Sequence, residues 1–172
     1  KHRPYAKSRQ GKEPIVLKIT VVAVGKLKEK FWVAACDEYL KRLRPYAKVT
    51  VAEIPDVDPA RAGGVEAARE REGAGILAAV PEGAHVILMA IEGKQRSSVE
   101  FSRHLDDLAL RGASELAFVI GGSDGVSDAV RARADETFSF GPITLPHNLA
   151  RVVLLEQLYR AEAIQAGSKY HK

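Results

Sequence analysis

The stretch LAFVIGGSDGVS, residues 116–127, contains the transition that decides the fold. Its first five residues are a continuous apolar run of the kind found in strands that are covered on both faces. The glycines of GGSDG (121–125) then break the strand, and Ser127 is a typical residue for the start of a helix. A buried strand followed at once by a helix is the repeating unit of an α/β protein.

The same alternation of strand and helix extends outward from this stretch in both directions. Apolar, β-branched segments predict four further strands, and helical periodicity predicts helices between them. Strands that alternate with helices predict a parallel α/β sheet with helices on both faces and a ligand site beyond the carboxyl ends of the strands. The predicted strands cover 16–24, 49–54, 85–91, 116–120 and 137–140, and the predicted helices cover about 31–44, 65–79, a segment from Ser97, a short segment near Ser127, and 149–166.

Local signals refine three of these elements. Ser97 and Glu100 have capping-box spacing at the start of the third predicted helix. The turn-rich segment PDVDPARAGG (55–64) predicts a mobile surface loop. The first helix is expected to pack along one side, which carries Phe31, Ala34, Ala35, Tyr39, Leu40 and Leu43.

The composition suits one folded domain, which we place at residues 15–172. Of 172 residues, 46% are hydrophobic and 28% are charged, values that exclude disordered and collagen-like chains. Residues 1–14 carry five basic residues against Glu13, so their net charge (5 − 1 = +4) equals that of the whole chain. We expect this segment to be a basic, flexible extension that either contacts RNA phosphates or is a bystander.

Compartment and metal content follow from what the sequence lacks. Lys18 interrupts the first apolar segment, no signal-cleavage pattern follows it, and no stretch reaches the roughly 18 apolar residues that span a membrane. Cys36 is the single cysteine, and no Cys and His cluster has zinc-site spacing. We therefore expect a cytoplasmic protein with neither a membrane segment nor a metal.

Two loops after predicted strands are candidates for ligand binding. GGSDG lets backbone donors approach a ligand, although such stretches are as often only tight turns. FGPITLPHN (140–148) is a rigid apolar loop that would suit an adenine ring, and the alternative is a packed connection into the last helix. The residues alone leave both choices open.

Several segments read together resemble one known family. They are VVAVGKLKEKF (21–31), LMAIEGKQRSS (88–98), FVIGGSDGVS (118–127), ITLPHNLARVVLLEQLYRA (143–161) and KYHK (169–172). Their order and spacing resemble the ribosomal RNA large-subunit methyltransferase H family of the SPOUT superfamily. Lys169 departs from the family pattern, in which proline usually precedes the Tyr-His pair.

The resemblance implies a SPOUT-type parallel sheet with a C-terminal trefoil knot, a homodimer, and an S-adenosylmethionine site in the knot. It also implies methyl transfer to N3 of a pseudouridine in 23S ribosomal RNA, on assembled ribosomes and without a metal. The implied cofactor-binding residues lie at or just after the ends of the third, fourth and fifth predicted strands: Met89, Gly121, Phe140, Gly141, Pro142, Ile143, Thr144 and Leu145.

The candidate catalytic residues are His171, Tyr170 and Arg151. The resemblance implies that the tail of one subunit, with Tyr170 and His171, covers the pocket of its partner, and Arg151 is a candidate for binding RNA phosphate or for a surface ion pair. The broadly apolar last helix favours a dimer contact or a central core helix. His85 and His104 are expected to be ordinary residues at a strand edge and on a helix surface.

Two other functions compete with this one. The first is a SPOUT methyltransferase that acts on another ribosomal base or on transfer RNA. The second is a non-catalytic RNA-binding module for ribosome assembly, in which basic residues supply the affinity. Cofactor binding discriminates between an enzyme and such a module.

Overall fold

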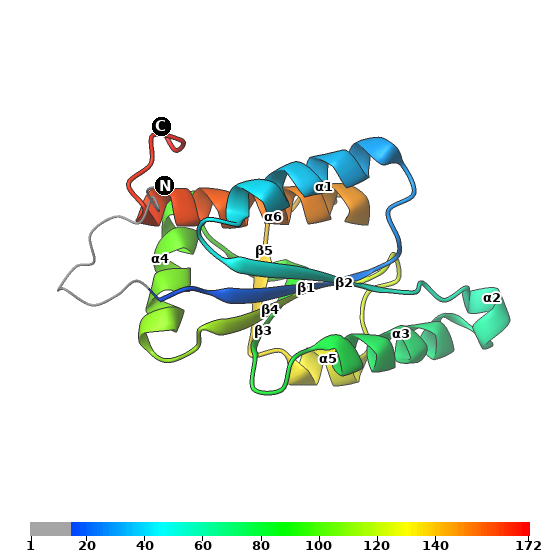
Figure 1. The fold of residues 1–172 in the computed structure, drawn as a ribbon. Coiled ribbons are helices and arrows are strands. Elements are labelled where there is room, and N and C mark those ends of the chain that lie inside the picture. Colours follow the sequence, from blue (N-terminus) through cyan, green and yellow to red (C-terminus); the bar gives the residue numbers. More distant parts are fainter. Residues whose placement is uncertain (1–14) are drawn as a thin grey trace.

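Five parallel strands form one sheet in the order β2-β1-β4-β3-β5 (Figure 1). The computed structural model describes residues 15–172, so the predicted extension at 1–14 lies outside the described residues. The predicted parallel α/β sheet is confirmed. In chain order the elements are β1 (Lys18–Val24), α1 (Lys30–Leu43), β2 (Lys48–Ile54), α2 (Pro59–Ala62), α3 (Val65–Ala79), β3 (His85–Gln95), α4 (Ser98–Leu110), β4 (Glu115–Ile120), α5 (Asp128–Arg133), β5 (Glu136–Ser139) and α6 (His147–Gln165).

Helices cover both faces of the sheet, which explains why the strands are apolar throughout. In Figure 1, α1 and α6 lie above the sheet, while α3 and α5 lie below it. Along β4, Leu116, Phe118 and Ile120 belong to the core under α1, α4 and α6. Ala117 and Val119, which point the other way, belong to the core over α3 and α5. No helix within residues 15–172 has the length and hydrophobicity to cross a bilayer.

The first helix differs from its prediction in which residues are buried. Phe31 is 63% exposed, whereas Cys36 and Leu43 are buried and face the core. The reason is that α1 packs on α6 through its middle and C-terminal turns, and its first turn extends past that contact. The prediction that Phe31 and Ala34 share the packed side is wrong.

The connection from β2 to α3 contains a helical turn that was expected to be loop. Asp58 caps this turn, α2, by accepting a hydrogen bond from the Ala60 N–H at 2.9 Å, and Pro59 occupies its first position. Proline is favoured there because its missing N–H would have no partner inside the helix.

β3 is longer than its apolar core because it carries a bulge. Its pairing with β5 runs from Ile87 to Met89, breaks, and resumes at Lys94 opposite Phe138. Gly93 lies so close to β5 that an added Cβ would be 2.8 Å from the Phe138 backbone. The bulge therefore depends on glycine, and it opens the backbone at the carboxyl end of β3.

The predicted capping box of α4 is confirmed, since Ser97 and Glu100 exchange hydrogen bonds.

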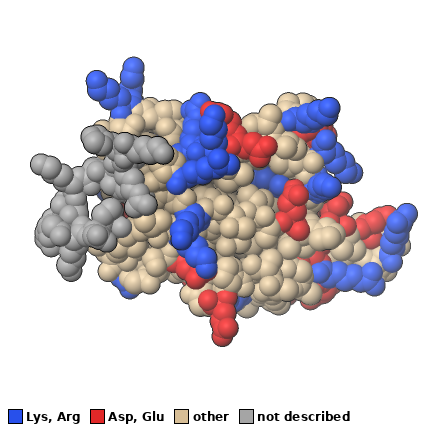
Figure 2. Space-filling view, in the orientation of Figure 1, with Lys and Arg blue, Asp and Glu red and all other residues tan. Residues whose placement is uncertain are grey.

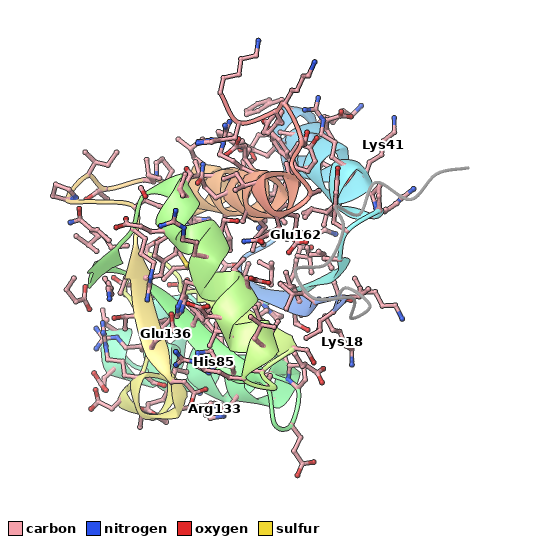
Figure 3. The ribbon with its side chains drawn as sticks, turned by 90° about the vertical axis from the view of Figure 1, so that its left-hand side faces the viewer. Lys18, Lys41, His85, Arg133, Glu136 and Glu162 are labelled. Carbon is pink, nitrogen blue, oxygen red and sulfur yellow. The ribbon has the colours of Figure 1, made fainter. Side chains whose placement is uncertain are left out.

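Long-range polar contacts fix α4 to the sheet. At the amino ends of β3 and β5, the Glu136 carboxylate lies 2.9 Å from His85 Nε2 (Figure 3). It also lies 2.7 Å from His104 Nε2. His85 and His104 thus join two strands to α4, which corrects the expectation that they are ordinary surface residues. The knot stays a prediction, since strand order and pairing leave the threading open.

Candidate active site

A cavity of about 650 Å³ lies at the bulge of β3 and at the carboxyl ends of β4 and β5. Three segments line it: 88–92 at the bulge, 120–126 at the end of β4 and 138–147 at the end of β5. The first residues of α6, including His147 and Ala150, close one side. Its size is within the range of small-molecule and cofactor sites, and its place is the one that an open parallel sheet favours.

Seven of the eight predicted cofactor residues border this cavity. They are Met89, Gly121, Phe140, Gly141, Ile143, Thr144 and Leu145, and the eighth, Pro142, is not among the lining residues. The sequence thus identified three segments that lie far apart in the chain and meet in space. That they bind a cofactor stays a prediction.

The loop after β5 is held in shape by one buried hydroxyl. Ser139 Oγ lies 2.8 Å from the Ile91 carbonyl oxygen and accepts a hydrogen bond from the Gly141 N–H at 3.0 Å. Gly141 itself has φ of +107°, a conformation that other residues adopt only with strain. The loop is therefore fixed to the bulged end of β3 before any ligand arrives.

Gly121 is needed for packing rather than for its backbone conformation. Its φ is not among the positive values, whereas Gly125 in the same turn has φ of +83°. A Cβ at Gly121 would lie 2.6 Å from Val126 Cγ1. The group that approaches Gly121 closely is therefore the Val126 side chain. Gly121 also borders the cavity.

The chemistry of the walls fits S-adenosylmethionine. Leu88, Ile120 and Leu145 offer apolar contacts for an adenine ring, and the backbone of the loop after β5 offers hydrogen bonds to its edge. Glu92 and Arg131 form an ion pair of 2.8 Å beside the cavity. Hydrogen bonding by its own backbone and by Arg131 lowers the pKa of Glu92, so this carboxylate stays ionised near a cationic ligand.

Glu92 and Arg131 escaped the sequence-based prediction. Glu92 stands beside Met89 in a segment already singled out, but Arg131 lies 39 positions away on α5. Within the described part of the chain, no group of three or more His, Cys, Asp or Glu side chains is arranged to hold a metal ion.

The tail with the candidate catalytic residues folds back on α6 of its own chain. Tyr170 Oη donates to Glu156 Oε1 at 3.1 Å, and Arg160 Nη1 lies 3.3 Å from His171 Nδ1. Arg160 also pairs with Glu156 at 2.7 Å and stacks its guanidinium 4.6 Å from the centre of the Tyr170 ring. Burial, followed by the hydrogen bond to Glu156, raises the pKa of Tyr170 to about 12. Sequence reasoning missed Glu156 and Arg160, whose i,i+4 spacing was the available signal.

Within one chain the tail and the cavity are separate. Neither Tyr170 nor His171 lines the cavity, which reaches α6 only at His147 and Ala150. Arg160 follows His147 by 13 residues, or about 20 Å along a helix. One subunit alone therefore does not combine the candidate catalytic residues with the candidate cofactor residues.

Arg151 is buried and forms an internal latch. Its side chain is 3% exposed, Nη1 pairs with Glu53 Oε2 at 2.7 Å, and Nη2 donates to the Gly25 carbonyl at 2.9 Å. Burial opposes the ionisation of Glu53, but hydrogen bonds from Arg151 and from the Leu27 N–H outweigh it and lower the Glu53 pKa. In place of the expected phosphate or surface contact, Arg151 joins α6 to β2 and to the loop after β1.

Comparison with known proteins agrees with this architecture. A family model described as predicted SPOUT methyltransferase matches residues 17–171. Ribosomal RNA large subunit methyltransferase H of Listeria monocytogenes serotype 4b (strain CLIP80459) is 52% identical over 159 residues, which cover 91% of this chain and all of that relative. The protein of the same name from Lactobacillus acidophilus is 50% identical with the same coverage.

Among solved structures, a probable methylase family protein from Haemophilus influenzae Rd KW20 has the same fold. It superposes with a TM-score of 0.53 at 12% identity, over 91% of this chain and 70% of that one. Together with the sequence matches, these findings place the chain in the SPOUT methyltransferase family, within the ribosomal RNA large subunit methyltransferase H group.

Proposed function

We propose that the protein is a cytoplasmic, S-adenosylmethionine-dependent methyltransferase that modifies N3 of a pseudouridine in 23S ribosomal RNA on assembled ribosomes. The carrying observation is the cavity at the carboxyl ends of β3, β4 and β5, which seven predicted cofactor residues line. The names of the relatives, which are 50–52% identical, support ribosomal RNA as the substrate.

The cofactor would be held by the three strand-end segments. The loop at Phe140–Leu145 would grip the adenine, because Ser139 fixes its backbone in advance and its apolar side chains face the cavity. Gly121 would let the ligand approach the backbone, since a larger residue there would displace Val126 of the cavity wall. When bound, S-adenosylmethionine supplies an electrophilic methyl group, so the protein needs mainly to align the target nitrogen with it.

We propose that the working unit is a homodimer in which the tail of one subunit acts at the cavity of its partner. The separation of about 20 Å between the tail and the cavity along α6 supports this arrangement. Apolar side chains support it as well, since Ile143 in the cavity lining is 63% exposed and Ile91 is 52% exposed. An exposed apolar rim around a site is typical of a surface that a partner covers.

His171 would act as a hydrogen-bond donor to the base. Arginine can only donate, so the 3.3 Å contact from Arg160 Nη1 makes His171 Nδ1 an acceptor. A neutral imidazole then carries its proton on Nε2, which is free to donate to a carbonyl oxygen of the pseudouridine. Such a bond disperses the negative charge that remains after N3 gives its proton to solvent water and until it takes the methyl group from the sulfonium, and Tyr170 and Arg160 would hold the imidazole in position.

The test is transfer of a radiolabelled methyl group to RNA. Assembled ribosomes, naked 23S RNA and transfer RNA are each incubated with the protein, and the modified nucleoside is identified after digestion. We expect N3-methylpseudouridine, formed mainly on assembled ribosomes. Label on another nucleoside or on transfer RNA would contradict the substrate, and cofactor binding without any transfer would contradict the enzymatic function.

A further inference from the structure

The corner between β1 and α1, residues 26–33, exposes both positive charge and aromatic surface. Lys26, Lys28 and Lys30 are exposed, and none of them has an ion-pair partner among residues 15–172. Phe31 is 63% exposed and its ring lies 4.9 Å from that of Trp32. Figure 2 shows basic side chains projecting at the upper right of the molecule, where this β1–α1 corner lies.

This arrangement does not help the chain to fold. Helix α1 begins at Lys30 with no side-chain cap from Glu29 and no acidic residue in its first turn. Positive charge at a helix N-terminus is unfavourable because it repels the positive end of the helix dipole, and a phenylalanine that is mostly exposed gains little from burial. Features that oppose local stability in this way are expected where a surface serves binding.

Two hydrogen bonds, the first of them buried, hold the start of the β1–α1 corner next to the cavity. Arg151 donates to the Gly25 carbonyl at 2.9 Å, and the Leu27 N–H donates to Glu53 Oε2 at 3.2 Å. A Cβ added at Gly25 would lie 3.6 Å from Nε2 of His147, which lines the cavity. The corner thus starts beside the first turn of α6, which closes the cavity, and the lysines and the aromatic pair follow within eight residues of Gly25.

We infer that the β1–α1 corner is an RNA-docking surface, on which the lysines pair with phosphates and Phe31 stacks on an unpaired base. The inference rests on the proposed function, because the RNA in question is the substrate that approaches the cavity. Phosphates complement the three lysines, and exposed aromatic rings are the platforms on which single-stranded bases stack. A twofold contact centred on this corner would instead bring the three lysines close to the same three lysines of the second copy.

Two variants separate the roles of charge and stacking. The triple variant Lys26→Gln, Lys28→Gln, Lys30→Gln is compared with a Lys41→Gln, Lys48→Gln control, which removes charge from exposed positions elsewhere. Binding to isolated 70S ribosomes is measured by co-sedimentation from 50 to 200 mM KCl. We expect the slope of log affinity against log salt to become shallower by about 2–3 in the triple variant, since each lost phosphate contact removes roughly 0.7–0.9. The control should keep the slope of the wild type.

Phe31→Ala should weaken ribosome binding by about 5–150-fold at every salt concentration, as expected for the loss of one stacked base. In methyl transfer, both variants should raise KM for ribosomes while kcat and cofactor affinity stay unchanged. Wild-type binding in folded variants would overturn the inference, as would a change from dimer to monomer in Phe31→Ala, which would assign the corner to a second copy. If the wild-type protein binds ribosomes through this corner yet transfers no methyl group, the proposed function fails and the inference stands.

Discussion

The carboxyl group of Glu162 on α6 is buried, and burial disfavours its charged form. Burial, followed by repulsion from Asp106, raises its pKa from 4.5 to about 7, and it has no ion-pair partner among residues 15–172. Figure 3 labels it on α6. Between pH 4.5 and 7 the folded chain therefore retains a proton that the unfolded chain releases. The free energy of unfolding should fall as the pH rises through this window and level off above it.

Glu162→Gln should remove this dependence. At pH 8 we expect the variant to be more stable than the wild type by about 1–3 kcal/mol, and at pH 4.5 we expect little difference. Urea unfolding at both pH values measures this, with Glu82→Gln as the exposed control. An equal effect of Glu162→Gln at pH 4.5 and pH 8 would show that the charge is not the cause.

His171 carries the prediction that concerns catalysis most directly. His171→Ala should keep the affinity for S-adenosylmethionine and lose about 100-fold or more in single-turnover methylation, because the imidazole acts on the base in the transition state. Asn at this position keeps a hydrogen-bond donor and should retain part of the rate. Tyr170→Phe should be milder than His171→Ala, since the ring keeps its contacts with Arg160 and Tyr159.

Calorimetry and rapid-quench assays on ribosomes together decide this prediction. A parallel loss of cofactor affinity and rate in His171→Ala would indicate misfolding, and an unchanged rate would remove His171 from the active site. If Asn and Ala were equally slow, the donor role of His171 would be wrong.

At the scale of elements, Arg151 is the latch that joins α6, β2 and the loop after β1. Arg151→Leu leaves Glu53 and the Gly25 carbonyl without this donor, and removal of one partner from a buried ion pair typically costs about 3–5 kcal/mol. Because Glu53 is one-third exposed, we expect about 3 kcal/mol in urea unfolding at pH 7.

Glu53→Gln tests the same latch from the other side. It should cost less, because an amide oxygen still accepts from Arg151 and from the Leu27 N–H. The lowered Glu53 pKa means that the wild type loses this stability as the pH falls below about 4.5, whereas the Gln variant should not. A wild-type free energy of unfolding in Arg151→Leu would contradict the latch.

The sequence was most informative where the determining interactions are local. The apolar runs of β1 and β4, the capping box at Ser97 and Glu100, and the glycine turn at 121–125 all lie within a few residues of the structure that they predict. The loops after β4 and β5 were candidates because each directly follows a strand and parallel strands end at the same edge, whereas Met89 was implied by the family resemblance.

The rest depended on partners that are distant in the chain. Arg151 and Glu53 are 98 positions apart, and His85 and Glu136 are 51 apart, so no periodicity connects them. The exposure of Phe31 escaped prediction because an amphipathic pattern does not report where the neighbouring helix ends. The bulge in β3 was not predicted, because Gly93 indicates a turn unless the close approach of β5 is known.

At the scale of the whole molecule, the separation of tail and cavity makes a prediction about subunit mixing. The wild type should sediment as a dimer of the 18.7 kDa chain. Gly121→Arg, whose side chain would displace Val126 in the cavity wall, and His171→Ala should each be inactive alone. After subunit exchange at equal concentration, half of the dimers are mixed and each has one intact composite site, so roughly a quarter of wild-type activity should return.

No recovery in proven mixed dimers would mean that each tail serves the cavity of its own chain. A fully active monomer would contradict both the dimer and the composite site. Mass-tagged subunits confirm that exchange has occurred, so that a negative result is interpretable.

The packing of α1 against α6 has a consequence for folding while the chain is being synthesised. These helices share one core, yet 103 residues (44–146) lie between them. At a synthesis rate of about 5–20 residues per second, the nascent α1 waits roughly 5–20 s before the helix that covers it is even translated. During that interval Leu43 and the apolar face of β1 have no permanent cover, so the emerging chain is expected to be a client of chaperones at the tunnel exit. Ribosome profiling of chaperone-bound nascent chains should then show chaperone binding that begins after β1 and α1 emerge from the tunnel. This binding should end once α6 has left the tunnel.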